Sequence, residues 1–173
     1  MTLTLSSRRA ARPFFRAVTS LFQRPPRLQI AALCYRVMAD PGPDGKRCEV
    51  LMVTSRGTGR WILPKGWPIM TRKGHKTAEI EAFEEAGVNG KAGKKPFASF
   101  QSHKGFRGGF AVPTDVLVYL VEVTGETQDY PELGQRERKW MPIEDAVKIA
   151  SEPGIARVLS RFNSEMANIL ASR

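Results

Sequence analysis

Three glutamates in one short segment, Glu81, Glu84 and Glu85, could do chemistry together. Their i, i+3, i+4 spacing places all three carboxylates on one face of a helix. Like charges so close together repel one another, and a hard divalent cation such as Mg²⁺, which prefers oxygen ligands, would offset that repulsion. The pattern therefore indicates a metal site, although three glutamates taken alone are more often the solvated face of a surface helix.

A helix over residues 77–86 must position these carboxylates. Thr77 is a suitable N-cap and Gly87 a suitable C-terminal stop. The other faces of this helix carry mainly small residues, which would let it approach a sheet closely: Ala78, Ala82, Phe83 and Ala86. The helix is thus expected to pack on one side and to be acidic on the other.

The stretch from Gly66 to Val88 resembles the Nudix box, Gly-x5-Glu-x7-Arg-Glu-U-x-Glu-Glu-x-Gly-U, where U is bulky and aliphatic. Gly66, Gly87, Val88 and the three glutamates are in register, and Ala82 occupies the first U position. Arg72 stands where the first Glu belongs and Ile80 where the Arg belongs. In the family these two residues look like partners that brace the loop against the helix. The departure concerns the loop and leaves the metal carboxylates intact.

Two further segments resemble one branch of this family. Arg60-Trp-Ile-Leu-Pro-Lys-Gly66 precedes the box, and Arg138-Lys-Trp-Met-Pro-Ile-Glu-Asp-Ala146 follows it. Both are similar to segments of the diphosphoinositol-polyphosphate phosphohydrolases and diadenosine-polyphosphate hydrolases, and the likeness covers about residues 28–162. It implies a Nudix fold, an α/β/α sandwich with a mixed β-sheet. We expect residues 1–27 to be a basic N-terminal extension and residues 28–173 the Nudix hydrolase domain.

The resemblance implies hydrolysis of a phosphoanhydride bond with Mg²⁺ or Mn²⁺. Glu81, Glu84 and Glu85 would hold the metal with the backbone carbonyl of Gly66, and the ion would lower the pKa of a bound water. A glutamate would orient or deprotonate that water, and Glu81, Glu85 and Glu137, which lies outside the box, are the candidates. Six basic residues are candidates to bind phosphate oxygens: Arg36, Lys65, Lys104, Arg107, Arg138 and Lys139.

The substrate implied by the resemblance is an anionic polyphosphate, either a diphosphoinositol polyphosphate or a dinucleoside polyphosphate. Trp67 is the tryptophan that we consider for substrate contact. Removal of pyrophosphate from the 5′ end of RNA is an alternative. A non-catalytic module that binds a nucleotide or RNA is another, and the intact glutamate set argues against it.

Positive charge is concentrated in the N-terminal residues. The 173 residues have a formal net charge of +10, and residues 1–30 contain six arginines and no acidic residue, so the remainder carries only about +4. Anionic partners are favoured, without a choice between nucleic acid, membrane and phosphorylated metabolites. Two cysteines suit reduced thiols in a cytoplasmic protein better than a disulfide framework or a zinc site.

The N-terminal arm carries apolar residues at helical spacing: Phe14, Phe15, Val18, Leu21 and Phe22. A short basic amphipathic helix is therefore expected. It could pack on its own domain or on a partner subunit, dock on a membrane surface, or act as an organelle presequence. No apolar run approaches the roughly 20 residues that a membrane-spanning helix needs. The sequence indicates no oligomeric state.

Beyond the arm, alternating and continuous apolar patterns predict strands over residues 29–37, 49–55, 61–63, 97–103, 114–124 and 137–141. Residues 104–113 form a glycine-rich loop that is either a solvated turn or a substrate lid. Helices over residues 143–150 and 154–171 close the chain.

Overall fold

The computed structural model describes residues 27–39, 45–105 and 111–171. Residues 1–26 of the basic arm, with the expected amphipathic helix, lie outside these residues, as do residues 106–110 of the glycine-rich loop. The predicted loop bounds of 104–113 are too wide, because residues 104–105 and 111–113 belong to paired strands. Within the described part of the chain, no helix is long and apolar enough to cross a membrane.

Eight strands of the described residues form one mixed sheet. Their bounds are β1 Arg27–Ala39, β2 Lys46–Thr54, β3 Trp61–Ile62, β4 Lys65–Gly66, β5 Val88–Ala92, β6 Ala98–Gly105, β7 Ala111–Glu126 and β8 Arg138–Pro142. The main order is β3-β2-β1-β7-β5, with β4 on β1, β6 on β7 and β8 on β2. β1 and β7 are parallel, and the remaining pairs are antiparallel. The expected mixed sheet is confirmed.

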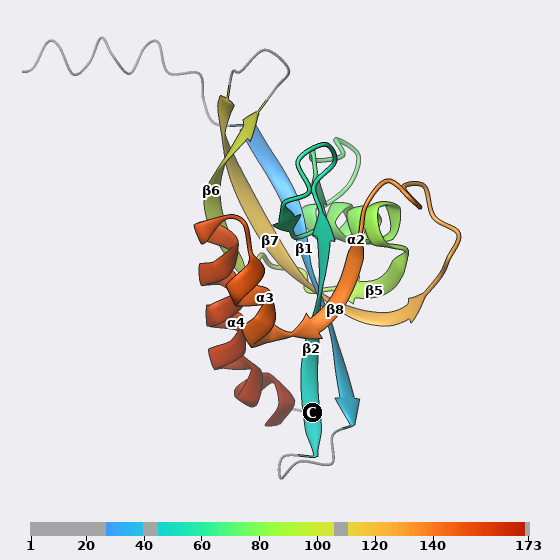
Figure 1. Ribbon diagram of the computed structural model, residues 1–173, viewed down its shortest axis with the longest axis vertical. Coiled ribbons are helices and arrows are strands. Elements are labelled where there is room, and N and C mark those ends of the chain that lie inside the picture. Colours follow the sequence, from blue (N-terminus) through green and yellow to red (C-terminus); the bar gives the residue numbers. More distant parts are fainter. Residues whose placement is uncertain (1–26, 40–44, 106–110, 172–173) are drawn as a thin grey trace, which may run out of the picture.

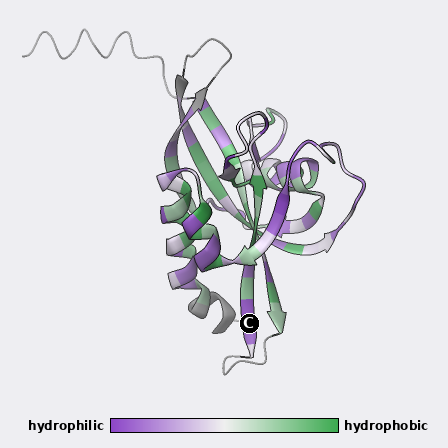
Figure 2. Ribbon diagram, viewed as in Figure 1, coloured by the Kyte–Doolittle hydropathy of each residue, from purple (hydrophilic) through white to green (hydrophobic). Residues whose placement is uncertain are grey.

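Helices cover both faces of the sheet. α2, Gly74–Ala86, lies on one face, and α3, Ile143–Ile149, with α4, Pro153–Ala171, lies on the other (Figure 1). Consecutive residues of β1, such as Leu33 and Cys34, are both fully buried. A strand with side chains alternating between two covered faces has this pattern, which confirms the expected sandwich. Hydrophobic residues are accordingly concentrated in the central strands of the sheet (Figure 2).

α4 contributes the larger apolar face. Its buried residues recur at helical spacing: Ile155, Val158, Leu159, Phe162 and Met166. The Phe162 ring is fully buried, with its centroid 5.3 Å from that of Tyr35 and 5.9 Å from that of Phe97. Full burial of each such side chain stabilises the fold by about 1.5–3 kcal/mol. α4 therefore fixes one wall of the molecule against β1 and β6.

α2 approaches the sheet through small residues, as the sequence predicted. Ala78, Ala82 and Ala86 are completely buried, and Gly87 ends the helix in the left-handed conformation with φ 64°. The predicted start at Thr77 is wrong, because the helix begins at Gly74. The Thr77 hydroxyl lies inside the helix and accepts a hydrogen bond from the Ile69 N–H at 3.4 Å. It thereby holds the preceding loop to the helix instead of capping it.

Candidate active site

The three box glutamates lie at different depths on α2. Glu85 is buried, Glu81 is half-buried and Glu84 is exposed. Three buried alanines, Ala78, Ala82 and Ala86, form an alanine seam that lets α2 pack closely on the sheet. Glu81 and Glu85 consequently face β4, while Glu84 faces solvent. The structure thus places two of the predicted carboxylates against β4 and the third at the solvent-exposed surface of α2.

Gly66 of β4 makes room for Glu81. A Cβ atom built on Gly66 would overlap the Glu81 carboxylate. β4 is paired with β1, where Gly66 lies opposite Ile30. Gly66 could therefore move away from Glu81 only if this strand pairing were broken. Next to it, the backbone N–H of Lys65 donates to Glu85 Oε2 at 3.2 Å. Gly66 and the Glu81 carboxylate are therefore in close contact, while metal ligation by the Gly66 carbonyl stays a prediction.

Arg136 lies among these carboxylates, although the sequence analysis did not select it. Its guanidinium donates to Glu85 Oε1 and to Glu132 Oε2, each at 2.5 Å, and to the carbonyl of Thr54 at 3.1 Å. Its side chain is only 6% exposed. In the sequence it is one of several basic residues between Gly134 and Trp140, and only the Glu132–Arg136 i, i+4 spacing could have hinted at its pairing.

The cluster raises the pKa values of two glutamates. Burial, and then repulsion from Glu85, Glu84 and Glu132, raises the pKa of Glu81 to about 7. Burial also raises the pKa of Glu85 to about 7, against the opposing effect of Arg136 and the Lys65 N–H. Both carboxylates therefore keep a proton to a higher pH than an exposed glutamate does, because water is excluded and negative charge is crowded around them.

A cleft of about 700 Å³ opens beside this cluster. Strands β1, β3, β4 and β6 line it together with α2, and the loops after β2, β4, β7 and α3 complete the lining. The lining residues are Gln29, Ser55, Arg56, Thr58, Arg60, Ile62, Lys65, Gly66, Trp67, Glu81, Glu84, Glu85, Ser102, His103, Glu132, Arg136 and Glu152. Four of these residues are basic and five are acidic. The lining is therefore slightly negative in formal charge, which disfavours a bare polyphosphate.

This charge balance and the donor chemistry fit a divalent cation. Glu81, Glu84, Glu85 and the nearby Glu132 supply hard oxygen donors, and a cation would lower the pKa of the buried pair. As the side chains are placed, no three carboxylates, histidines or cysteines in the described ranges converge on one point. Glu85 is turned toward Arg136, so metal binding would require rearrangement of these side chains.

Arg36 lies away from the cleft, although the sequence suggested that it binds phosphate. Its guanidinium pairs with Glu49 at 2.8 Å and with Glu126 at 2.9 Å. It also lies over the Trp140 ring, 4.2 Å from the centroid. These contacts give Arg36 a structural role on the sheet, because its charge is already matched by two carboxylates.

The residues predicted on or before β8 are also absent from the lining of the cleft. Arg138 donates to the carbonyl of Ala86 at 2.5 Å and lies over the Tyr130 ring. Lys139 and Glu137 are exposed. The predicted phosphate contacts of Arg138 and Lys139, and the catalytic role of Glu137, therefore gain no support from the geometry.

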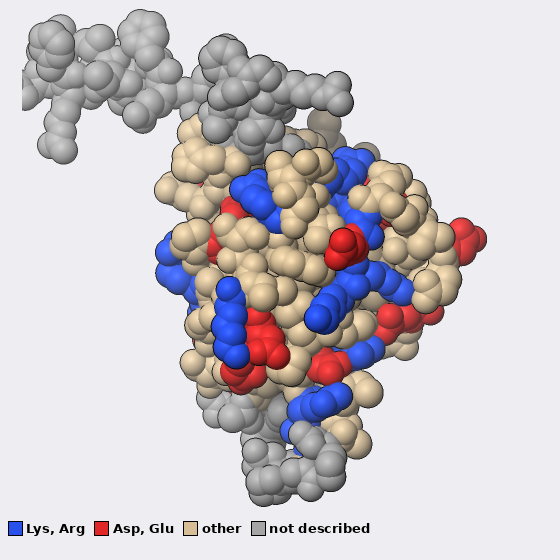
Figure 3. All heavy atoms as spheres, in the orientation of Figure 1, with Lys and Arg blue, Asp and Glu red and all other residues tan. Residues whose placement is uncertain are grey.

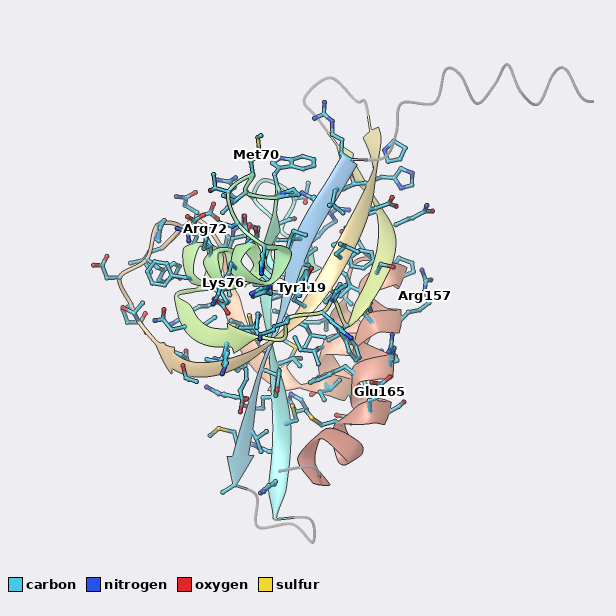
Figure 4. The ribbon with its side chains drawn as sticks, turned by 180° about the vertical axis from the view of Figure 1, so that it is seen from behind. Met70, Arg72, Lys76, Tyr119, Arg157 and Glu165 are labelled. Carbon is cyan, nitrogen blue, oxygen red and sulfur yellow. The ribbon has the colours of Figure 1, made fainter. Side chains whose placement is uncertain are left out.

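Lys65 is the predicted basic residue that the structure does bring to the cleft, together with Arg56 and Arg60, which the sequence analysis did not select. The Lys104 side chain and all of Arg107 lie outside the described residues. Arg72, at the departed box position, is exposed in the loop before α2, on the far side of the molecule from α4 (Figure 4). Basic and acidic side chains alternate on the face in Figure 3, in keeping with the mild charge predicted for this domain.

Comparison with known proteins gives one family match and several relatives. The NUDIX domain model matches residues 27–162. Nudix hydrolase 12, mitochondrial, of Arabidopsis thaliana is 29% identical over 150 residues, covering 79% of this chain and 72% of that protein. Human diphosphoinositol polyphosphate phosphohydrolase 3-beta is 33% identical over 125 residues, covering 69% of this chain and 66% of that protein. The chain thus spans about two thirds of the length of the human relative.

Two solved structures have the same fold. A C. elegans Ap4A hydrolase binary complex superimposes with a TM-score of 0.61 at 22% identity, covering 82% of this chain and 98% of that chain. A mutT/nudix family protein from Listeria innocua gives a TM-score of 0.60 at 16% identity, covering 87% of this chain and 100% of that chain. At these identities the likeness concerns the arrangement of the sheet and helices alone.

Proposed function

The chain belongs to the NUDIX family of hydrolases, and we propose that it is a metal-dependent pyrophosphohydrolase that cleaves a phosphoanhydride bond of a polyphosphorylated substrate. The observation that carries this proposal is the cluster of box carboxylates beside Gly66 at the wall of a cleft. The names of the relatives add two substrate classes to the proposal, the diphosphoinositol polyphosphates and the dinucleoside polyphosphates.

Glu81, Glu84 and Glu85, with the carbonyl of Gly66, are the proposed ligands of Mg²⁺ or Mn²⁺. Such an ion would neutralise the diphosphate and lower the pKa of a bound water. Lys65, Arg56 and Arg60 line the cleft, which supports the proposal that they bind phosphate oxygens. Glu81 or Glu85 is proposed to accept a proton from the attacking water as the phosphorus–oxygen bond to the leaving phosphate breaks. Glu137, exposed and outside the cleft lining, is the weaker candidate for this role.

A panel of substrates assayed with Mg²⁺ and with Mn²⁺ tests the proposal. The panel contains a diphosphoinositol polyphosphate, a dinucleoside polyphosphate and a triphosphorylated RNA, and the products are separated by chromatography. Turnover that requires the divalent ion and disappears in the Glu84→Gln variant supports a hydrolase. Tight binding of a panel member without turnover would favour the non-catalytic module instead.

The arm motivates the second candidate, an RNA 5′-pyrophosphohydrolase. Six arginines without an acidic residue in residues 1–30 would favour the phosphate backbone of a nucleic acid. They would also favour an anionic membrane surface. Deletion of residues 1–26, followed by RNA-binding and liposome-binding measurements, distinguishes these partners. Loss of RNA turnover together with RNA binding would support the RNA candidate.

We propose a cytoplasmic location, with an organelle as the alternative that the arm raises. Two Arabidopsis thaliana relatives carry the word mitochondrial in their names. Imaging of fluorescent fusions with and without residues 1–26 distinguishes the two, since a presequence would redirect only the full chain. The division into an extension, 1–27, and a hydrolase domain, 28–173, remains part of the proposal.

A further inference from the structure

The cleft contains an acidic residue far in sequence from the box. Glu152 lies in the connection between α3 and α4, and Ser102 lies on β6. The Ser102 hydroxyl donates a hydrogen bond to Glu152 Oε2. Ser102 is only 7% exposed, and both residues line the cleft together with His103. This wall comes from β6 and the α3–α4 connection, and α2 does not contribute to it.

Neighbouring contacts fix the position of Glu152. The Ser151 N–H donates to the carbonyl of Trp61 at 3.0 Å, which holds the connection against β3. The N–H groups of Ile155 and Ala156 donate to the carbonyl of Glu152 at 3.0 and 3.1 Å. Gly154 packs so closely on β6 that an added Cβ would overlap the Phe100 ring. The carboxylate is therefore presented to the cleft by a rigid segment.

The chemistry of the Ser102–Glu152 pair is unsuited to phosphate. A carboxylate repels a phosphate group, and Ser102 already donates its hydroxyl proton to Glu152, so this pair offers mainly acceptor lone pairs. Hydroxyl and amino groups of a ligand could donate to those lone pairs. Sugar hydroxyls and the exocyclic amines of nucleobases have this chemistry, whereas a fully phosphorylated inositol ring presents negative charge at every position.

Trp67 provides a second feature that suits a nucleoside. It lines the same cleft and is 37% exposed, and the guanidinium of Arg27 lies over its ring, 5.9 Å from the centroid. A nucleobase could contact the part of the indole surface that is exposed. Stacking of a nucleobase on an aromatic ring is favourable for every base, because each base has a π-face. An inositol ring has no such face.

We infer that Glu152, held by Ser102, is a specificity-determining residue that selects polyphosphates ending in a nucleoside over polyphosphorylated inositols. The inference rests on the proposed hydrolase function. It concerns the moiety beyond the diphosphate and leaves the bond cleaved and the carboxylates of α2 as proposed.

Charge reversal and charge removal at Glu152 test the inference. The wild-type protein, Glu152→Gln and Glu152→Lys are compared for kcat/KM and for equilibrium binding in Ca²⁺, with diadenosine tetraphosphate and a diphosphoinositol pentakisphosphate as probes. We expect the wild type to favour the dinucleotide. Glu152→Lys should shift the ratio of the two affinities toward the inositol by about tenfold or more, since removal of like-charge repulsion is joined by attraction. Glu152→Gln should give a smaller shift in the same direction.

Two further variants sharpen the comparison. Glu144→Lys makes the same charge reversal at an exposed position on α3 outside the cleft lining, and we expect it to leave the ratio within about twofold. Trp67→Leu should weaken binding of the dinucleotide by about fivefold or more, with little effect on the inositol ligand. Circular dichroism and thermal unfolding verify that each variant is folded.

Each outcome bears on a different claim. A ratio that is unchanged in folded Glu152→Lys, or that changes equally in Glu144→Lys, overturns the inference while leaving the hydrolase proposal intact. Loss of all turnover in Glu152→Gln would instead make Glu152 part of the catalytic machinery and would also overturn the inference. If the wild type hydrolyses neither probe, the proposed function fails, and the Ca²⁺ binding ratio still decides whether Glu152 selects the ligand.

Discussion

Neutralising Glu81 tests whether the carboxylate cluster is under electrostatic strain. Glu81→Gln keeps the shape of the side chain and removes its charge. In the folded protein, burial and then repulsion from Glu85 raise the pKa of Glu81 from its ordinary 4.5 to about 7. The folded state therefore keeps this proton to a higher pH than the unfolded chain does. The contribution of protonated Glu81 to the free energy of unfolding is fully present below about pH 4.5 and is lost as the pH rises through about 7.

The size of the effect follows from this difference. One pKa unit corresponds to about 1.4 kcal/mol, so raising the pKa of Glu81 from 4.5 to about 7 gives roughly 3.5 kcal/mol without screening. Glu81 is only half-buried, and solvent reduces this value. We expect Glu81→Gln to raise the free energy of unfolding of the metal-free protein at pH 8 by about 1–2 kcal/mol. That gain corresponds to an increase in Tm of roughly 2–8 °C for a chain of this length.

Urea denaturation with a chelator present, at pH 4.5 and at pH 8, measures the effect. The variant should match the wild type at the lower pH and exceed it at the higher one. Addition of Mg²⁺ at ten times its dissociation constant should stabilise the wild type by about 1.4 kcal/mol and the variant by less. Glu144→Gln, at an exposed site on α3, is the control and should stay within about 0.5 kcal/mol at both pH values.

Two results would refute this reasoning. If Glu81→Gln is no more stable than the wild type at pH 8, the crowded carboxylates do not strain the fold. If the variant gains as much at pH 4.5 as at pH 8, its stability has a source other than charge, such as better packing of the amide.

Other substitutions separate catalysis from stability. Glu84→Gln should lower Mg²⁺-dependent turnover by about 100-fold or more with an unchanged circular dichroism spectrum; near-normal turnover would contradict the metal assignment. Arg72→Ala should retain activity within about threefold, because Arg72 is exposed, and complete loss would reveal an unforeseen role. Arg136→Met should lower the free energy of unfolding by about 3–5 kcal/mol in urea titrations, since Glu85 loses its buried partner. Arg56→Met, at a side chain 61% exposed, should cost less than about 1 kcal/mol by the same measurement.

The sequence was most informative where a periodic pattern coincided with burial. The apolar run in β1, the alanine face of α2 and the stop at Gly87 all predicted the observed structure. The family resemblance is confirmed as well. β5, Val88–Ala92, was not predicted, because its residues are mostly polar or small and their strand conformation depends on pairing with β7.

Site residues were harder to predict where they depend on distant contacts. Arg136 meets Glu85 across 51 positions and Glu152 meets Ser102 across 50, so no local spacing reports either pair. Conversely, Arg36 and Arg138 were selected for their charge, and the structure uses that charge to hold other parts of the fold. Residue type indicated what these side chains could do, and tertiary contacts decided which of them reach the cleft.

The alanine seam of α2 makes the site unusually sensitive to mutations that never touch it. Ala78, Ala82 and Ala86 are completely buried between α2 and the sheet, so a larger side chain at any of them would overpack this interface and favour displacement of α2 from the sheet. Glu81 would then move away from Gly66, because both are carried by the elements that the seam joins. In a library of random variants, the inner face of α2 should therefore tolerate fewer substitutions than its outer face, and many inactive variants would carry an intact set of site residues.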